Sequence, residues 1–165
     1  ADGMNLLRES GLARAVCTRA RQGVPLLGIC LGMQFLFDSS SEGGLTPGLG
    51  LLPGTVEAIP GHTTQGQPLR VPHIGWAPLY PAQQRESFLG STLEAIPTKS
   101  QVYFVHGYRA MPARQADRLA DTLYGGHRIC AAVQRGNITG VQFHPEKSGE
   151  VGLVILRTFL GSCPA

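Results

Sequence analysis

The chain has 165 residues, of which 42% are hydrophobic and 15% charged, with a formal net charge of +3. The average apolar content excludes intrinsic disorder, and no window approaches the ~18 uninterrupted apolar residues of a membrane helix. The small, unclustered positive charge gives no argument for nucleic-acid binding. We therefore expect one soluble domain over residues 1–165, with neither nucleic acid nor membrane as a partner.

The first third of the chain alternates helix and strand. Apolar residues recur at helical spacing from Leu6 to Ala20, and the sequence Gly23-Val24-Pro25 ends this expected helix. The apolar run 25–29 has the length of a buried parallel strand, and a second helix is expected over 30–37. Residues 38–54 are rich in Ser, Gly and Pro, which predicts a loop.

The rest of the chain favours strands, because β-branched and aromatic residues alternate with Gly or Pro turns. The expected strands are 55–59, 69–71, 101–106, 118–123, 129–135 and 138–144. An amphipathic helix over 149–160 follows them. This order of elements predicts an α/β sandwich with an antiparallel portion.

The cysteines and histidines follow no metal-binding or disulfide pattern. The four cysteines are far apart with no CxxC pair, so a disulfide framework is not indicated and we expect a cytoplasmic location. The five histidines lack paired-ligand spacing, and we expect neither a metal nor another cofactor. His62, His73 and His127 are interpreted as ordinary loop residues.

The sequence Gly28-Ile-Cys-Leu-Gly32 places a cysteine between an expected strand and an expected helix. It is the thiol counterpart of the GxSxG nucleophile elbow, in which the glycines avoid collisions and the central residue is strained. We expect the helix N-terminus to lower the pKa of the Cys30 thiol, and the Leu31 N–H to donate to a developing oxyanion. The alternative is that Cys30 is a small buried hydrophobe, as most free cysteines are.

A second candidate motif, His144-Pro145-Glu146, ends an apolar strand. Pro145 favours an extended His144, so the imidazole and the Glu146 carboxylate point to the same side. A carboxylate on one ring nitrogen fixes the tautomer and leaves the other nitrogen for the thiol. The alternative is a strand-end histidine beside a solvated glutamate, but together the two motifs favour a catalytic triad.

These motifs resemble those of class I, triad-type glutamine amidotransferases. The segments that carry the resemblance are Gly28–Gln34, Pro72–Trp76, Val102–Tyr108 and Gln142–Gly149. They are most similar to the glutamine amidotransferase subunits of imidazole glycerol phosphate synthases, and Met33 favours these over the anthranilate synthase type, which usually has His there. The resemblance implies a flavodoxin-like sandwich with a mostly parallel central sheet.

The resemblance also implies the chemistry and the partner. Cys30 would attack the side-chain amide of glutamine, His144 would protonate the departing ammonia, and Glu146 would orient His144. The ammonia would pass to a (β/α)8-barrel cyclase subunit in histidine biosynthesis. The positions that resemble the family's glutamine-holding residues are Gln34, His106, Gly107 and Tyr108.

Two further residues resemble the family's interface positions. Trp76 would face the cyclase, although a single tryptophan is more often in the core. Lys147 would also contact the cyclase, although a lysine is usually a solvated surface charge.

The sequence departs from the family pattern at three places. The family's first strand–helix–strand, ending in a Pro-Gly-Val-Gly loop that donates to the oxyanion, does not precede Ala1, so we expect weak or no glutaminase activity from this chain. Equal ammonia release from an N-terminally extended protein would contradict that expectation. Gly107 replaces a hydroxyl residue and Ala77 a common Asn.

Two alternatives remain at this point. The chain could be another class I amidotransferase or a thiol peptidase-like relative. It could also be a docking subunit that regulates a cyclase without catalysis.

Overall fold

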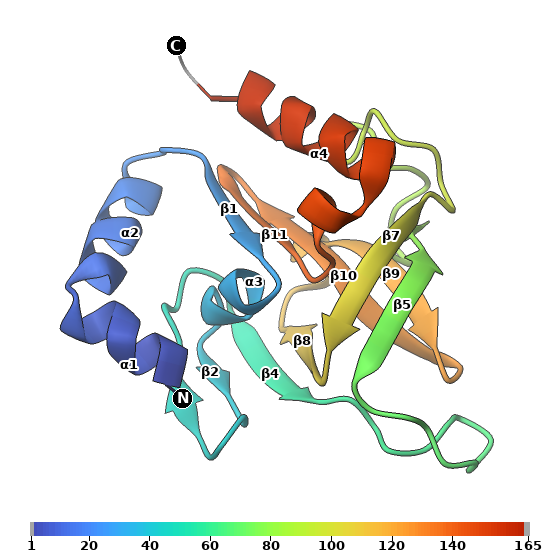
Figure 1. The fold of residues 1–165 in the computed structure, drawn as a ribbon. Coiled ribbons are helices and arrows are strands. Elements are labelled where there is room, and N and C mark those ends of the chain that lie inside the picture. Colours follow the sequence, from blue (N-terminus) through green and yellow to red (C-terminus); the bar gives the residue numbers. More distant parts are fainter. Residues whose placement is uncertain (1, 164–165) are drawn as a thin grey trace.

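The computed structural model describes residues 2–163 as a mixed, curled β-sheet with helices on both faces (Figure 1). The helices are α1 Asp2–Glu9, α2 Leu12–Arg21, α3 Leu31–Phe35 and α4 Gly149–Gly161, with 3-10 turns η1 Gln115–Asp117 and η2 Pro145–Lys147. The longer strands are β1 Leu26–Ile29, β4 Gly54–Ala58, β5 His73–Pro78, β7 Gln101–His106, β8 Tyr108–Pro112, β9 Arg118–Tyr124, β10 His127–Arg135 and β11 Ile138–Val141. Two-residue strands are β2 Ser39–Ser40, β3 Thr46–Pro47 and β6 Tyr80–Pro81.

The expected α/β class is confirmed, but the expected mostly parallel sheet is wrong in this detail. The main sheet has the order β1-β11-β10-β8-β4-β2-β3, and β1–β11 and β2–β4 are its parallel pairs among the described residues. Two-residue connections, Gly125-Gly126 and Gly136-Asn137, join β9 to β10 and β10 to β11. Connections this short allow only antiparallel pairing.

Several expected elements differ from the observed ones. The expected first helix is two helices, because Gly11 adopts a left-handed φ of 75° between α1 and α2. Residues 69–71 form no strand, whereas 73–78 do, despite a glycine at position 75. The expected strand 138–144 ends at Val141, and β2 and β3 lie in the expected loop.

The sheet separates two groups of buried side chains. Along β11, Gly140 faces Met33 of α3, whereas the next residue, Val141, joins the cluster that contains Ile155 of α4. Met33 belongs to the other cluster, with Val133 of β10. Because successive strand residues point to opposite faces, α3 and α4 cover opposite sides of this part of the sheet.

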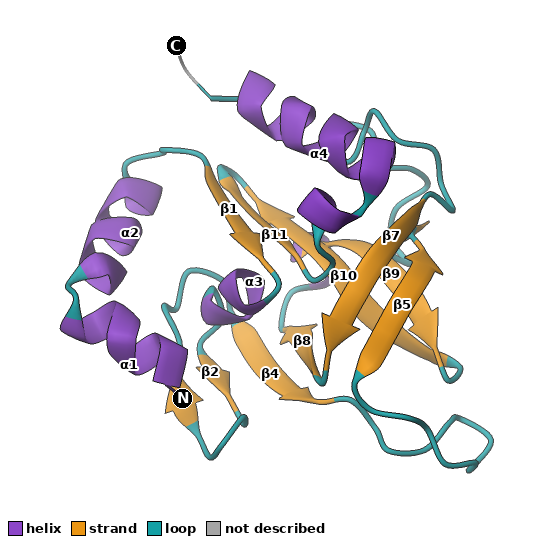
Figure 2. Ribbon diagram, in the orientation of Figure 1, coloured by secondary structure: helices purple, strands orange, loops and turns teal. Residues whose placement is uncertain are grey.

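The turn between β1 and α3 positions the candidate nucleophile (Figure 2). Cys30 has a backbone φ of 50°, a value that residues other than glycine rarely adopt. A Cβ on Gly28 would lie 2.7 Å from the Gly32 carbonyl oxygen, so glycine is required there. A Cβ on Gly32 would meet no neighbouring atom within 4 Å, so the expected collision holds for Gly28 and not for Gly32.

Among residues 2–163, none of the helices has both the length and the apolar character needed to cross a membrane.

We expect Gly28→Ala to destabilise the fold by about 1–3 kcal/mol, because the added methyl meets backbone that cannot move aside. Gly32→Ala is the matched control, and its stability should be unchanged or up to about 1 kcal/mol higher, since alanine favours a helix. Urea unfolding measures both. A Gly28→Ala protein as stable as the control would contradict the close approach of β1 and α3.

Candidate active site

Cys30 and His144 follow adjacent parallel strands and leave the sheet at the same edge. The Ile29 and Val141 positions pair in register, and the Cys30 N–H donates to the Val141 carbonyl at 2.7 Å. The His144 N–H donates to the Tyr103 carbonyl of β7 at 2.9 Å. Carboxyl ends of parallel strands are the usual place for ligand chemistry in α/β sheets.

The imidazole of His144 is held by Glu146. Nδ1 of the ring lies 2.6 Å from Glu146 Oε1, with Glu146 in the η2 turn. Ser148 links this segment to β7. Its hydroxyl donates to the His144 carbonyl at 2.6 Å and accepts from the Tyr103 N–H at 3.0 Å. A carboxylate on Nδ1 leaves Nε2 as the nitrogen available for proton transfer.

The Cys30 thiol is half-buried and its surroundings are polar. Its sulfur lies 3.8 Å from the Val105 carbonyl and accepts from Gln142 Nε2 at 3.6 Å. No hydrogen bond joins this sulfur to the His144 ring among the described residues. The surroundings of Cys30 therefore differ from those of Cys130, which is fully buried in the core.

The expectation of a lowered thiol pKa is wrong. Burial raises the pKa of Cys30, and the negative charges of Glu146 and Glu42 raise it further. Hydrogen bonds from the Leu31 backbone N–H and the Gln142 amide act in the opposite direction without offsetting the burial. Leu31 itself is exposed at the start of α3, and its backbone N–H hydrogen-bonds the Cys30 sulfur.

Gln34 lies at the centre of a buried hydrogen-bond network. Its Nε2 donates to Gln142 Oε1 at 2.9 Å and to the Tyr108 carbonyl at 3.3 Å. Gln142, which is fully buried, connects this network to the nucleophile, because its Nε2 donates to the Cys30 sulfur. Sequence reasoning gave Gln142 no role, although a lone amide in an otherwise apolar strand is a signal of buried polar function.

His106 and His73 form a second buried pair next to this network. His106 Nδ1 lies 2.8 Å from the Tyr108 carbonyl, and its Nε2 lies 3.2 Å from His73 Nδ1. Because both ring nitrogens of His106 are occupied, its ring has no free group for glutamine. The interpretation of His73 as a loop residue is wrong, since it is a buried residue of β5.

A family model described as glutamine amidotransferase class-I matches residues 3–162. The chain belongs to the class I glutamine amidotransferase family. It is 47% identical over 159 residues to imidazole glycerol phosphate synthase subunit HisH 1 of Legionella pneumophila (strain Lens), covering 96% of this chain and 75% of the relative. It is 48% identical over 158 residues to subunit HisH of Geobacillus sp. (strain WCH70), covering 96% and 72%.

A longer relative is similar in sequence, and a solved structure is similar in fold. The chloroplastic imidazole glycerol phosphate synthase hisHF of Arabidopsis thaliana is 44% identical over 161 residues, which are 97% of this chain and 26% of the relative. A crystal structure of a glutamine amidotransferase is similar in fold, with a TM-score of 0.65, 22% identity, and coverage of 96% of this chain and 71% of that one.

Two residues, Gly107 and Ala77, depart from the glutamine amidotransferase pattern, and they have different surroundings. A Cβ on Gly107 would lie 3.7 Å from Val71 Cγ1, an ordinary contact, so the backbone here has space for a side-chain carbon. Ala77 is buried in β5, next to the exposed Trp76.

A small hollow lies beside α3, which begins directly after the nucleophile. It measures about 20 Å³, room for about one water, and is lined by Met4 of α1, Leu31, Gln34 and Glu42 among others. A space of this size is far smaller than the pockets that hold small-molecule ligands.

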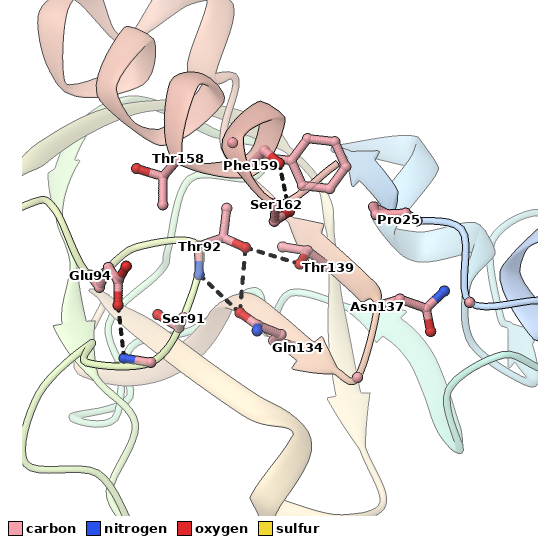
Figure 3. A pocket seen from close by; sticks show the side chains of 14 residues that line it. Pro25, Ser91, Thr92, Glu94, Gln134, Asn137, Thr139, Thr158, Phe159 and Ser162 are labelled. Carbon is pink, nitrogen blue, oxygen red and sulfur yellow. Dashed lines mark hydrogen bonds between the residues drawn. The ribbon is translucent and has the colours of Figure 1, made fainter. Parts of the chain in front are cut away.

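The larger hollow, of about 650 Å³, lies at the opposite end of β1 and β11, beside Pro25 and Asn137 (Figure 3). Its polar groups largely bond one another: Gln134 Oε1 accepts from the Thr92 N–H at 3.0 Å, and the Thr92 and Thr139 hydroxyls lie 3.1 Å apart. Size alone therefore does not mark the reactive site in this fold.

The pKa of the Cys30 thiol should lie above its ordinary value of 9.0 and respond to single substitutions in opposite directions. Glu146→Gln should lower this pKa, because a negative charge beside the thiolate is removed. Gln142→Leu should raise it, because a donor to the thiolate is lost. The pH dependence of iodoacetamide alkylation measures each value, with Cys30→Ser as the background for the other cysteines. An inflection below pH 9 in the wild-type protein would contradict the effect of burial.

Proposed function

We propose that this chain is the glutaminase subunit of an imidazole glycerol phosphate synthase, which hydrolyses glutamine and supplies the ammonia to a cyclase subunit. The observation that carries the proposal is that Cys30 and the hydrogen-bonded His144–Glu146 pair follow the adjacent, in-register strands β1 and β11, and that the Glu146 charge acts on the Cys30 thiol. The identity of about 47% to subunits of this synthase supports the choice within the family. The reaction needs no cofactor.

In the proposed reaction the thiol begins protonated, because burial raises its pKa. As the Cys30 sulfur attacks the amide carbon of glutamine, the thiol proton moves to His144 Nε2, and Glu146 stabilises the imidazolium. The imidazolium then protonates the leaving nitrogen, and ammonia and a glutamyl thioester result. Water, deprotonated by the same imidazole, hydrolyses the thioester to glutamate and restores the thiol. Among the described residues no hydrogen bond joins the sulfur and the ring, and a nucleophile–base hydrogen bond commonly tightens in the complex with substrate.

Glutamine recognition is assigned to the groups on the α3 side of Cys30. Glu42 is half-buried, lines the small cavity with Gln34, and its charge reaches the Cys30 sulfur. A zwitterionic amino acid needs a carboxylate for its ammonium group, and Glu42 provides one. Tyr108 and Gly107 contribute backbone, and Leu31 contributes its N–H to the oxyanion.

The docking face for the cyclase is assigned to the outer side of the β5–β7 ribbon. Trp76 is 57% exposed and Ile74 55% exposed, and the Trp76 ring lies edge-on to Tyr103 with centroids 6.0 Å apart. Val105, two residues beyond Tyr103 on β7, contacts the Cys30 sulfur through its carbonyl. A partner on this face, with exposed Lys147 at its margin, would lie next to the site of ammonia release. A (β/α)8-barrel cyclase is the partner that we propose.

Cys30→Ala should abolish ammonia production from glutamine, because the nucleophile is lost. In a mixture with the cyclase, the same variant should retain product formation from added ammonia. Coupled assay of glutamate and of the cyclase product measures both. Persistent glutamine-dependent synthesis would contradict the role of Cys30, and a wild-type chain that binds the cyclase but releases no ammonia would favour a docking subunit.

Trp76→Ala should weaken cyclase binding by about 2 kcal/mol, roughly 30-fold in Kd, if the exposed indole is a central anchor of the interface. Leu45→Ala is the control, because Leu45 is 84% exposed and lies outside the β5–β7 ribbon. Titration calorimetry with the cyclase compares the two variants. Equal affinities would place the interface elsewhere.

A further inference from the structure

A continuous path of hydrogen bonds leads from buried His73 to the Cys30 sulfur. It runs from His73 to His106, from His106 to the Tyr108 carbonyl, and from that carbonyl to Gln34. Gln34 and Gln142 complete it, with distances of 2.9 Å between their side chains and 3.6 Å from Gln142 to the sulfur. The path joins β5, β7, β8, α3 and the end of β11 through buried groups.

Each donor along this path is determined by the one before it. The Tyr108 carbonyl can only accept, so His106 Nδ1 carries a hydrogen. A neutral imidazole has one N–H, so His106 Nε2 is an acceptor and His73 Nδ1 must donate to it. Gln34 Nε2 has two hydrogens, one for the Tyr108 carbonyl and one for Gln142 Oε1, which directs the Gln142 N–H to the sulfur.

Both histidines are held neutral by their surroundings. Burial and the neighbouring His106 lower the pKa of His73 to about 4. Burial also lowers the pKa of His106, and the nearby His144 adds to this effect, whereas the bond to the Tyr108 carbonyl opposes it.

His73 is held in place by aromatic rings on both sides. Its ring stacks on Tyr124 of β9 at 4.0 Å and on Phe104 of β7 at 4.9 Å between centroids. The Tyr124 hydroxyl is itself fixed, because it donates to the Arg70 carbonyl at 2.6 Å. The titratable side chains that act on the pair are Tyr124, which stacks on His73, and His144, whose charge acts on His106.

We propose that His73 is a positioning residue: it donates to His106 Nε2, stabilises together with the Tyr108 carbonyl the neutral Nδ1–H form of His106, and thereby keeps the Tyr108 carbonyl, Gln34 and Gln142 oriented toward the nucleophile. His73 touches neither the sulfur nor the small cavity, so it acts only through His106. The consequence for turnover rests on the proposed glutaminase function, whereas the tautomer does not.

Nitrogen NMR of the histidine-labelled full chain tests the tautomer directly. At neutral pH we expect His106 Nε2 to give the signal of an unprotonated ring nitrogen and Nδ1 that of a protonated one. A protonated Nε2 in the wild-type protein would overturn the proposal without any variant. This measurement is independent of whether the chain hydrolyses glutamine.

Two substitutions separate the donor of His73 from its packing. His73→Phe keeps a ring between Tyr124 and Phe104 but removes the N–H that stabilises neutral His106, so the pKa of His106 should rise. His73→Asn places an amide N–H near the former Nδ1 and should restore the wild-type His106 signals. A His73→Phe protein with unchanged His106 titration, or one whose change Asn does not reverse, would overturn the proposal in favour of packing alone.

The kinetic arm uses the complex with the cyclase. Loss of one buried hydrogen bond is worth about 1 kcal/mol, so His73→Phe should raise KM for glutamine roughly 5-fold and move the acidic limb of the kcat/KM profile to higher pH. His73→Asn should return both to near wild type. If the wild-type complex releases no ammonia, the proposed function fails while the NMR result still decides the role of His73. Unchanged kinetics with an altered His106 titration would overturn the link from His73 to the nucleophile.

Discussion

The 2.7 Å hydrogen bond from the Cys30 N–H to the Val141 carbonyl extends the parallel β1–β11 pairing by one residue into the site. It fixes the position of Cys30 along the strand direction relative to the segment with His144, which follows the neighbouring strand β11. Everything else around the sulfur depends on this register. A shift of one residue would turn the side chains of β11 to opposite faces and remove Gln142 from the thiol.

The fold resolves a conflict between strain and packing at the β1–α3 turn. Cys30 occupies a backbone region with φ 50°, and Gly28 is needed because the first turn of α3 passes directly over it. Met33 then packs on Gly140 of β11, so the helix that follows the nucleophile is locked to the strand that leads to His144. Strained positions persist only where neighbours determine them in this way.

Much of the fold and the residue types of the site were predictable from sequence. The Cys30 turn, the helix from Gly149 and the strands at 101 and 118 depend on local patterns, and the structure has them. The strand at His73 was missed because its glycine, and the prolines at 72 and 78, interrupt the alternation of strand residues. The thiol pKa was predicted with the wrong sign, since burial depends on distant segments that no local motif contains. The single domain and the cytoplasmic location remain predictions.

Strand β7 has two sets of residues with separate surroundings. Val102, Phe104 and His106 point into the protein, whereas Tyr103 and Val105 alternate with them on the outer side beside Trp76. Side chains of the outer set can therefore be replaced without touching the contacts that the inner set makes. Within six consecutive residues, β7 thus keeps the side chains that face solvent apart from those that pack beside the nucleophile.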